Sequence, residues 1–374
     1  MKIVIFGLSI TSSWGNGHAT TFRALGKALH ARGHRIVFFE RNAEWYESNR
    51  DLPRPPFCQL HIFEDWRQVL PQARKQLQDC DVAMVGSYSP DGIAAIDEVF
   101  NSPARVKAFY DIDTPITMSQ LHERGGTGYL RQDQVPGFDL YFSFTGGPTL
   151  REIEGRFGAR RAIPLYCSFD PEKYQARAGR RYDCDLSYMG TYAPDRQPKI
   201  EQFFCAPARL LPERKFMVAG PQYPRKLRWP KNVRRIMHLN PRWHPHFYSS
   251  SRLTLNVTRR EMVLTGYSPS VRLFEAAGCG ATIVSDNWPG LDTFFRPSEE
   301  ILLPTSADDV VRYIRAADAE LRQVGRRAQA RVLAEHTNDQ RARQFEDYIA
   351  QAAEKNYSFQ AAHALADDVQ SLAR

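Results

Sequence analysis

The sequence has few of the features that mark membrane, secreted or zinc-binding proteins. No apolar run approaches the roughly 18 residues that a membrane-spanning helix needs. The early run Ile3–Phe6 is too short for a signal sequence and lacks a small-residue cleavage site. The six cysteines include no Cys-x-x-C pair and no tight spacing, which argues against a disulfide framework or a zinc site. We therefore expect buried thiols and a cytoplasmic protein.

Acidic residues are outnumbered. The 374 residues include 50 Lys and Arg against 42 Asp and Glu, a formal charge of +8. This excess favours anionic ligands or surfaces. The arginines are scattered and no block typical of nucleic-acid binding stands out, so we predict no nucleic-acid partner. A peripheral membrane contact is compatible with the charge. The length predicts two or three domains.

The first half of the chain alternates short apolar runs with helical patterns. Lys2–Gly7 and Arg35–Glu40 are predicted strands around a helix at Thr20–Ala31, which ends near Gly33. The alternation favours a doubly wound, largely parallel sheet with ligands beyond the carboxyl ends of its strands. Further predicted strands are Gln59–Phe63, Asp81–Gly86, Val106–Asp111, Asp139–Phe144 and Arg161–Leu165.

A second α/β series follows a connection that prolines interrupt. We expect an N-terminal Rossmann-like domain at 1–165, a linker at 166–180, a C-terminal Rossmann-like domain at 181–337 and a helical tail at 338–374. The cleft between the two domains is the expected place for a ligand. The predicted strands of the second series are Cys184–Gly190, Lys215–Gly220, Val233–Leu239, Leu253–Val257, Ala281–Ser285 and Glu300–Leu303.

The stretch Gly266–Asn287 is the most informative part of the chain. A helix is predicted to start at Pro269, where a missing N–H costs nothing, with Ser268 as its cap. Gly278 is the expected end, and a short β-branched strand follows. The free N–H groups and positive dipole of such a helix start favour an anion.

Three side chains share one face of this helix. Ser268, Arg272 and Glu275 fall at i, i+4 and i+7. Arg272 suits a phosphate, and Glu275 lies about 9 Å further along, roughly the distance from a diphosphate to its ribose. The alternative is an exposed Arg272–Glu275 ion pair on an ordinary surface helix, worth a few tenths of a kcal/mol.

Glycine-rich loops mark other candidate sites. In the loop before the first helix, Gly15-Asn16-Gly17 comes too late after the strand for the dinucleotide fingerprint. The longer loop favours a site for a substrate or a phosphate instead. Gly190 and Gly220 each end a predicted strand and open a loop. The candidate residues in these two loops are Gly190, Arg196, Gly220 and Pro221.

Several segments together resemble GT-B glycosyltransferases and, more narrowly, the CgeB-like or spore-maturation group. The resemblance implies two facing Rossmann-type domains, a nucleotide-sugar donor held by the C-terminal one, an acceptor on the N-terminal one, and a final helix that crosses back to the first domain. The segments that carry it are Gly15–His18, Tyr110–Pro115, Gly190–Arg196, Leu255–Val257 with Arg259, Tyr267–Ala276, and His336–Thr337 with Arg341.

The resemblance also implies roles for single residues. Glu275 resembles the glutamate that binds the donor ribose, and Arg196 a stabiliser of the leaving phosphate. The helix start resembles the diphosphate site, with Tyr267, Ser268, Ser270, Val271 and Arg272 as donor-binding residues. Retaining members of the fold carry a second glutamate eight residues before the first. Here that position is Tyr267, so the stereochemical outcome stays open.

The expected reaction is transfer of a hexosyl group from a nucleoside-diphosphate sugar to a hydroxyl-bearing acceptor, with no metal and no further cofactor. Helix N-termini and arginines would stabilise the leaving diphosphate. An inverting reaction needs a general base, for which His18 or Asp113 would serve, with Asp111 nearby. The alternatives are a loop-capping histidine, helix-capping aspartates, or a metal site at Asp111-Ile-Asp113.

Two other functions fit the same architecture. One is a sugar-nucleotide 2-epimerase, and the other is a non-catalytic protein that retains a nucleotide site. Release of an epimer without acceptor would identify the first, and donor binding without turnover the second. The sequence specifies neither the nucleotide, the sugar nor the acceptor, which could be a glycan, a lipid, a protein or a small molecule.

Overall fold

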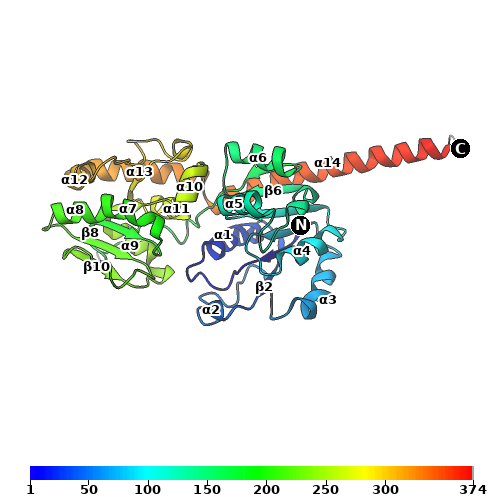
Figure 1. Ribbon diagram of the computed structural model, residues 1–374, viewed down its shortest axis with the longest axis horizontal. Helices are drawn as coiled ribbons and strands as arrows, with labels where there is room; N and C mark the ends of the chain where they lie inside the picture. The colour runs from blue at the N-terminus through cyan, green and yellow to red at the C-terminus, as the bar shows by residue number, and fades with distance from the viewer. Residues whose placement is uncertain (180, 373–374) are drawn as a thin grey trace. The chain divides into compact units, whose positions relative to one another are not determined.

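The computed structural model describes residues 1–179 and 181–372, with side chains through residue 356. The chain forms two compact units. Unit 1 comprises Met1–Leu165 together with the chain from Arg341 onward, and unit 2 comprises Tyr166–Gln340. Each unit contains one parallel sheet flanked by helices (Figure 1). The predicted α/β fold with two parallel sheets is confirmed.

Unit 1 contains a seven-stranded parallel sheet in the order β3-β2-β1-β4-β5-β6-β7. The strands β1, β4 and β6 are buried at every residue and β5 at all but one, because helices cover both faces of the sheet, and such strands are the continuous apolar runs visible in the sequence. All seven were predicted. They are β1 (Lys2–Gly7), β2 (Arg35–Arg41), β3 (Gln59–Phe63), β4 (Val82–Gly86), β5 (Val106–Asp111), β6 (Leu140–Ser143) and β7 (Ala162–Pro164).

The strand order of unit 1 reverses between β1 and β4. At such a switch point the loops after the two strands turn apart and leave a crevice at the carboxyl edge. The helices that flank the sheet are α1 (Gly17–Ala31), α2 (Glu44–Glu47), α3 (Trp66–Leu77), α4 (Gly92–Phe100), α5 (Thr114–Arg124) and α6 (Pro148–Phe157).

Unit 2 contains a five-stranded parallel sheet in the order β10-β9-β8-β11-β12, with its switch point between β8 and β11. The predicted sixth strand at 300–303 is wrong, because only Leu302 pairs with β12. The next residue that would donate to the ladder is Pro304, which has no N–H. The strands are β8 (Cys184–Met189), β9 (Phe216–Ala219), β10 (Val233–Ile236), β11 (Ser251–Asn256) and β12 (Thr282–Ser285).

The helices of unit 2 are shorter until α13, whose apolar stripe is buried and which packs against α11, β11 and β12. The main ones are α7 (Gln197–Ile200), α8 (Ala206–Leu210), α9 (His244–Ser250), α10 (Arg260–Thr265), α11 (Val271–Gly278), α12 (Ala307–Arg315) and α13 (Asp318–Glu335). No helix in the described part of the chain is long and apolar enough to cross a membrane.

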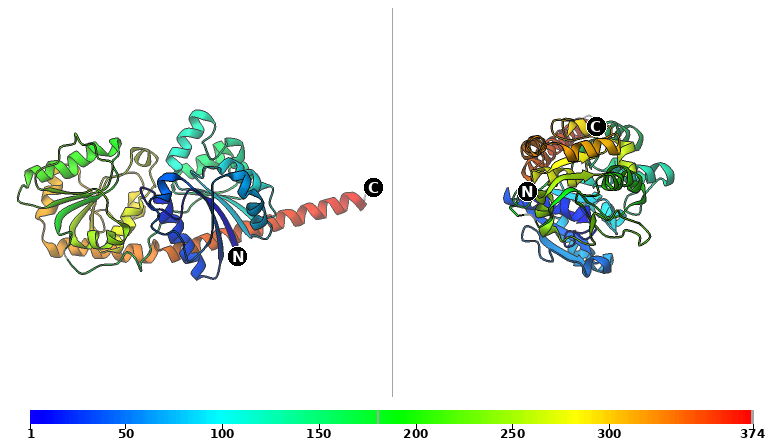
Figure 2. Two further views of the ribbon diagram at one scale, coloured as in Figure 1. Left: turned by 90° about the horizontal axis from the view of Figure 1, so that it is seen from below. Right: turned by 90° about the vertical axis from the view of Figure 1, so that its left-hand side faces the viewer.

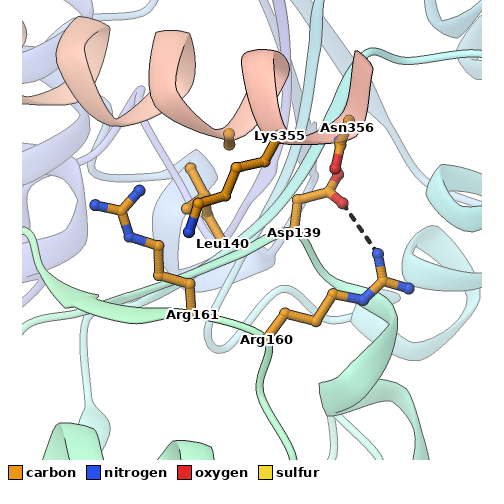
Figure 3. Close-up of a pocket in the computed structure, with 7 residues that line it drawn as sticks. Asp139, Leu140, Arg160, Arg161, Lys355 and Asn356 are labelled. Carbon is orange, nitrogen blue, oxygen red and sulfur yellow. Dashed lines mark hydrogen bonds and ion pairs between the residues drawn. The ribbon is translucent and has the colours of Figure 1, made fainter. Parts of the chain in front are cut away.

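The last helix, α14 (Asn338–Leu372), begins in unit 2 and continues along unit 1 (Figures 1 and 2). Its Glu346 accepts hydrogen bonds from Arg32 and His34, so the helix lies at the amino ends of the strands. Figure 3 shows a pocket of about 420 Å³ beneath it. The pocket is lined by Asp139, Leu140, Arg160, Arg161, Ala352, Lys355 and Asn356.

Candidate functional site

A buried carboxylate holds the loop that follows β1. Glu40, at the carboxyl end of β2, accepts hydrogen bonds from the backbone N–H groups of Ile10 and Thr11 at 2.6 and 3.0 Å. The hydroxyls of Ser9 and Thr11 donate to its other oxygen. These four bonds satisfy a carboxylate that has no exposed surface. The sequence analysis missed Glu40, although an acidic residue closing an apolar strand was a usable signal.

The segment Gly15-Asn16-Gly17 forms the start of α1. Asn16 is the N-cap, and its side-chain oxygen accepts from the backbone N–H of His18 at 2.9 Å. Gly15 has φ +58°, a conformation that glycine adopts without strain. The helix therefore begins at Gly17 rather than at the predicted Thr20. This start places His18 in the first turn, at the carboxyl edge of the sheet.

His18 and Asp113 form a close pair. Nε2 of His18 lies 2.6 Å from Oδ2 of Asp113, and the Ser87 hydroxyl donates to the same oxygen at 3.3 Å. We assign the proton of the neutral imidazole to Nε2, because that nitrogen faces a carboxylate. Nδ1 of His18 then keeps its lone pair, and it is buried without a hydrogen-bond partner in the described structure. The pair unites the loops after β1, β4 and β5.

Asp111 lies beneath this pair and is fully buried. It accepts hydrogen bonds from the hydroxyls of Tyr141 at 2.6 Å and Thr117 at 2.7 Å, and from the N–H of Asp113 at 3.2 Å. Burial nevertheless raises the pKa of Asp111 to about 7. Asp113 is the N-cap residue of α5 but makes no side-chain cap. Among the described residues, no three His, Cys, Asp or Glu gather as metal ligands.

Two glycine loops of unit 2 pack against each other at the ends of β8 and β9. Gly220 has φ +150°, and a Cβ atom there would lie 2.0 Å from the carbonyl oxygen of Gly190. The Tyr223 hydroxyl donates to that same oxygen at 3.1 Å, and the N–H of Tyr192 donates to the carbonyl of Pro221. Only glycine fits at position 220, so the two loops hold a fixed backbone surface at the carboxyl edge.

Helix α11 begins two residues later than predicted. Its first residue is Val271 and its N-cap is Ser270, so the predicted start at Pro269 with Ser268 as the cap is wrong. The Ser270 side chain does not cap the helix, because its hydroxyl donates to Asn256 at 3.0 Å. Ser268 is 1% exposed. The predicted end at Gly278 is correct.

Tyr267 occupies a tight turn rather than the helix. It has φ +47°, its N–H donates to the carbonyl of Pro289 at 2.7 Å, and its ring packs over Gly290. A side chain at position 290 would collide with that ring. Tyr267 therefore fixes the chain that leads into α11, and Val271 follows half-buried at the helix start.

Two arginines lie together at the switch point of unit 2. One terminal nitrogen of Arg272 bonds Asn256 at 2.9 Å, and the other approaches Gly190. Arg196, 9% exposed, donates to the carbonyl of Thr191 at 2.6 Å, and its Nε is buried without a hydrogen-bond partner. Burial, with the nearby charge of Arg272, lowers the pKa of Arg196. Neither arginine forms an ion pair with a carboxylate in the described part of the chain.

Glu275 points into unit 2 and is 5% exposed. Burial raises its pKa, against a hydrogen bond from the Tyr174 hydroxyl and the nearby charges of Lys173 and Arg272. The alternative of an exposed Arg272–Glu275 ion pair is therefore wrong. The sequence analysis gave no role to two partners of this helix. Asn256, the last residue of β11 and part of the segment 255–257 noted for the family resemblance, orients Arg272 and Ser270, and Tyr174 comes from the stretch expected to be a linker.

The candidate residues thus form two groups, one in each unit. Unit 1 brings together Gly15, Asn16, Gly17, His18, Asp111 and Asp113 at the carboxyl edge of its sheet. Unit 2 brings Arg272 to Gly190 and Arg196, with Gly220 and Pro221 in the adjoining loop. Each group lies at a switch point in strand order, where open α/β sheets bind ligands.

Comparisons with known proteins agree with this architecture. Residues 196–347 match a protein family described as glycosyl transferase-like. Sucrose-phosphate synthase (tll1590) from Thermosynechococcus elongatus superposes with a TM-score of 0.65 at 14% identity, covering 97% of this chain and 100% of that one.

Two further solved structures were determined with a sugar nucleotide. Anabaena Alr3699/HepE in complex with UDP-glucose has a TM-score of 0.68 at 12% identity, covering 94% of this chain and all of that one. An alpha-glucosyltransferase with UDP-glucose and DNA containing an abasic site also scores 0.68, at 13% identity, covering 94% and 99%. No curated protein sequence matches the chain. The fold is that of the GT-B glycosyltransferases.

Proposed function

We propose that this protein is a glycosyltransferase that moves a sugar of the hexose type from a uridine diphosphate sugar to a hydroxyl-bearing acceptor. The observation that carries the proposal is the pair of guanidinium groups of Arg196 and Arg272. Arg196 is buried and Arg272 is half-buried, neither has a carboxylate partner in the described structure, and both lie at the switch point of unit 2. Buried positive charge without a counterion favours an anionic ligand. The match of residues 196–347 and the UDP-glucose complexes of two structural neighbours support the same reading.

In this proposal unit 2 binds the donor. Arg196, Arg272 and the start of α11 with Ser270 contact the diphosphate, since a guanidinium and a helix start both suit phosphate oxygens. Glu275 accepts hydrogen bonds from the ribose hydroxyls. The loops at Gly190 and at Gly220 with Pro221 approach the nucleotide through their backbone, and Tyr267, Ser268 and Val271 hold the chain around it.

The two arginines would also stabilise the charge that develops on the leaving diphosphate. We therefore propose a reaction that needs no metal. Asp111 and Asp113 already accept hydrogen bonds from Tyr141, Thr117, His18 and Ser87, which leaves little of either carboxylate for an ion. Turnover that persists in excess EDTA is the expected result, and turnover that returns only with added Mg²⁺ or Mn²⁺ would contradict it.

Unit 1 would activate the acceptor. Nδ1 of His18 takes the proton of the acceptor hydroxyl, and Asp113 stabilises the imidazolium that forms. Asp111 acts as a positioning residue through the N–H of Asp113. A general base of this kind fits inversion at the anomeric carbon, so the product should carry the opposite configuration to the donor sugar. If NMR of the product shows that the anomeric configuration of the donor sugar is retained, His18 does not have this role.

The test is a thermal-shift and calorimetry panel with UDP, GDP, ADP and dTDP, followed by incubation of the best binder's sugar derivatives with candidate acceptors. Stabilisation by UDP and slow hydrolysis of a UDP-sugar without acceptor are expected. Formation of an epimer would instead identify a 2-epimerase, and binding without any turnover a non-catalytic protein. The narrower CgeB-like assignment stays a prediction.

A further inference from the structure

One stretch of unit 2 carries charge of a single sign. From Arg214 to Arg260 the sequence contains 12 Lys and Arg and no Asp or Glu, and six of the 12 fall within residues 225–235. The sequence analysis described the arginines as scattered and missed this block. Lys/Arg-rich runs of this density are typical of surfaces that bind polyanions or anionic lipids.

The block lies at one edge of the second sheet. It forms the loop after β9 and the outermost strand, β10, which pairs with no further strand in the described part of the chain. All six basic side chains are exposed, including the two neighbours on β10. Arg234 and Arg235 are consecutive on this strand, so their side chains point to opposite faces of the sheet at its edge. We call these six residues the basic edge: Arg225, Lys226, Arg228, Lys231, Arg234 and Arg235.

The charge of the basic edge is not neutralised within the described structure, since no member forms an ion pair with a carboxylate there. Other cations of the same stretch behave differently. Arg214 and Arg252 pair with Asp185 at 3.2 and 3.0 Å, and Arg259 pairs with Asp195 at 2.9 Å. The nearby Glu213 lies 3.9 Å from its own neighbour, Arg214. The fold thus pairs these three cations with carboxylates and leaves the basic edge without such partners in the described structure.

The aromatic ring that the basic edge contacts, that of Trp229, is partly buried. Arg235 lies 5.9 Å from the ring centre of Trp229, which packs edge-on with Phe204 and Tyr223. Single-stranded nucleic acid needs exposed ring faces on which bases stack. By contrast, Met237 beside Arg235 is 61% exposed and can enter the headgroup region of a bilayer. We propose that the basic edge docks on an anionic membrane surface.

The expected strength follows from the number of charges. Each Lys or Arg close to an anionic bilayer raises the partition coefficient about fivefold at low ionic strength, so six raise it roughly 10⁴-fold. The interaction is electrostatic and acts over a Debye length of about 8–10 Å at physiological salt. Binding should therefore weaken steeply with added salt and vanish on a neutral bilayer.

The experiment is co-sedimentation of the full-length protein with vesicles of phosphatidylcholine alone and of phosphatidylcholine mixed equally with phosphatidylglycerol. The variant Arg228→Gln/Lys231→Gln/Arg234→Gln removes three exposed charges whose side chains form no hydrogen bond or ion pair within the described residues. It should bind the anionic vesicles roughly 100-fold more weakly than the wild type, by the same fivefold step per charge.

A matched control removes the same charge from unit 1. Lys75→Gln/Arg124→Gln/Arg151→Gln also replaces three exposed basic side chains without carboxylate partners in the described structure. This control should bind the anionic vesicles within about threefold of the wild type, because dispersed charges act only weakly at a distance. Equal thermal unfolding midpoints for all three proteins would exclude misfolding as the cause.

Several results would overturn the proposal. Wild-type protein that stays in the supernatant with anionic vesicles would do so. Equal losses of vesicle binding in the two triple variants, or equal binding of the wild type to neutral and anionic vesicles, would do so too. Retention on heparin without vesicle binding would also overturn it, in favour of a soluble polyanion. No nucleotide is needed in the assay, so its outcome is independent of the proposed donor site.

Discussion

Replacing Arg272 by glutamine separates a ligand-binding arginine from a structural one. The glutamine amide can still donate to Asn256, as the guanidinium does at 2.9 Å. The positive charge beside Arg196 is removed, and this charge helps to lower the pKa of Arg196. Under the proposed function the substitution deletes a diphosphate contact, and it also relieves repulsion between the half-buried Arg272 and the buried Arg196.

The substitution should weaken UDP binding strongly but change the free energy of unfolding only slightly. A hydrogen bond from a charged donor contributes about 1.5–3 kcal/mol, and each 1.4 kcal/mol is about a factor of ten in affinity. UDP should therefore bind roughly 10- to 100-fold more weakly. The free energy of unfolding should change by less than about 1 kcal/mol, because the relieved repulsion offsets the weaker bond to Asn256.

The assay pairs calorimetric titration of UDP with urea unfolding, and Arg252→Gln is the matched control. Arg252 is a half-buried guanidinium of β11 that pairs with Asp185 at 3.0 Å and bonds Asp318 at 2.8 Å. Its loss should lower the free energy of unfolding by about 1–3 kcal/mol. The affinity for UDP should stay within about twofold of the wild type.

The refuting result is the opposite pattern. If Arg272→Gln binds UDP as tightly as the wild type but unfolds several kcal/mol more easily, Arg272 is part of the packing of unit 2. Its place at the switch point would then say nothing about a ligand.

Three further predictions concern other residues of the two groups. Burial raises the pKa of Glu275, and ribose hydroxyls favour its ionised form, so UDP binding should release a proton and the affinity for UDP should fall as the pH drops through this raised pKa. The variant Glu275→Gln should lack this pH dependence, and equal pH profiles of the two proteins in calorimetry would contradict the ribose role. His18→Ala should lower kcat by roughly 10²- to 10⁴-fold at unchanged UDP affinity, as measured by product formation, and wild-type turnover would strike it from the catalytic residues. Gly220→Ala should lower the free energy of unfolding by at least about 2 kcal/mol, because its Cβ would meet the Gly190 carbonyl at 2.0 Å, and an unchanged urea midpoint would refute this steric account.

The sequence predicted the strands well because both sheets are parallel and covered on both faces. Lys2–Gly7 and the other central strands are therefore continuous apolar runs with clear ends. The run at 300–303 shows the limit of this signal. It is apolar and β-branched in part, yet a proline after Leu303 prevents the ladder from continuing.

Helix starts and side-chain partners were predicted less well. The predicted cap, Ser268, is wrong because α11 begins after Ser270, whose hydroxyl donates to Asn256 instead of capping the helix. His18 and Asp113 were predicted separately, but their 2.6 Å contact depends on the strand order, which the sequence pattern does not specify. The contacts of Asn256 were not predicted for the same reason, since its partners lie 14 and 16 residues away.

Hydrogen–deuterium exchange with and without UDP tests the central claim most directly, because it locates the nucleotide without mutation. The account predicts slower exchange in three segments of unit 2: 188–196, 219–223 and 268–276. The segment around the edge strand β10, and the sheet of unit 1, should exchange at unchanged rates. Protection confined to other segments, or no protection at a UDP concentration that stabilises the protein, would contradict the assignment of the donor site.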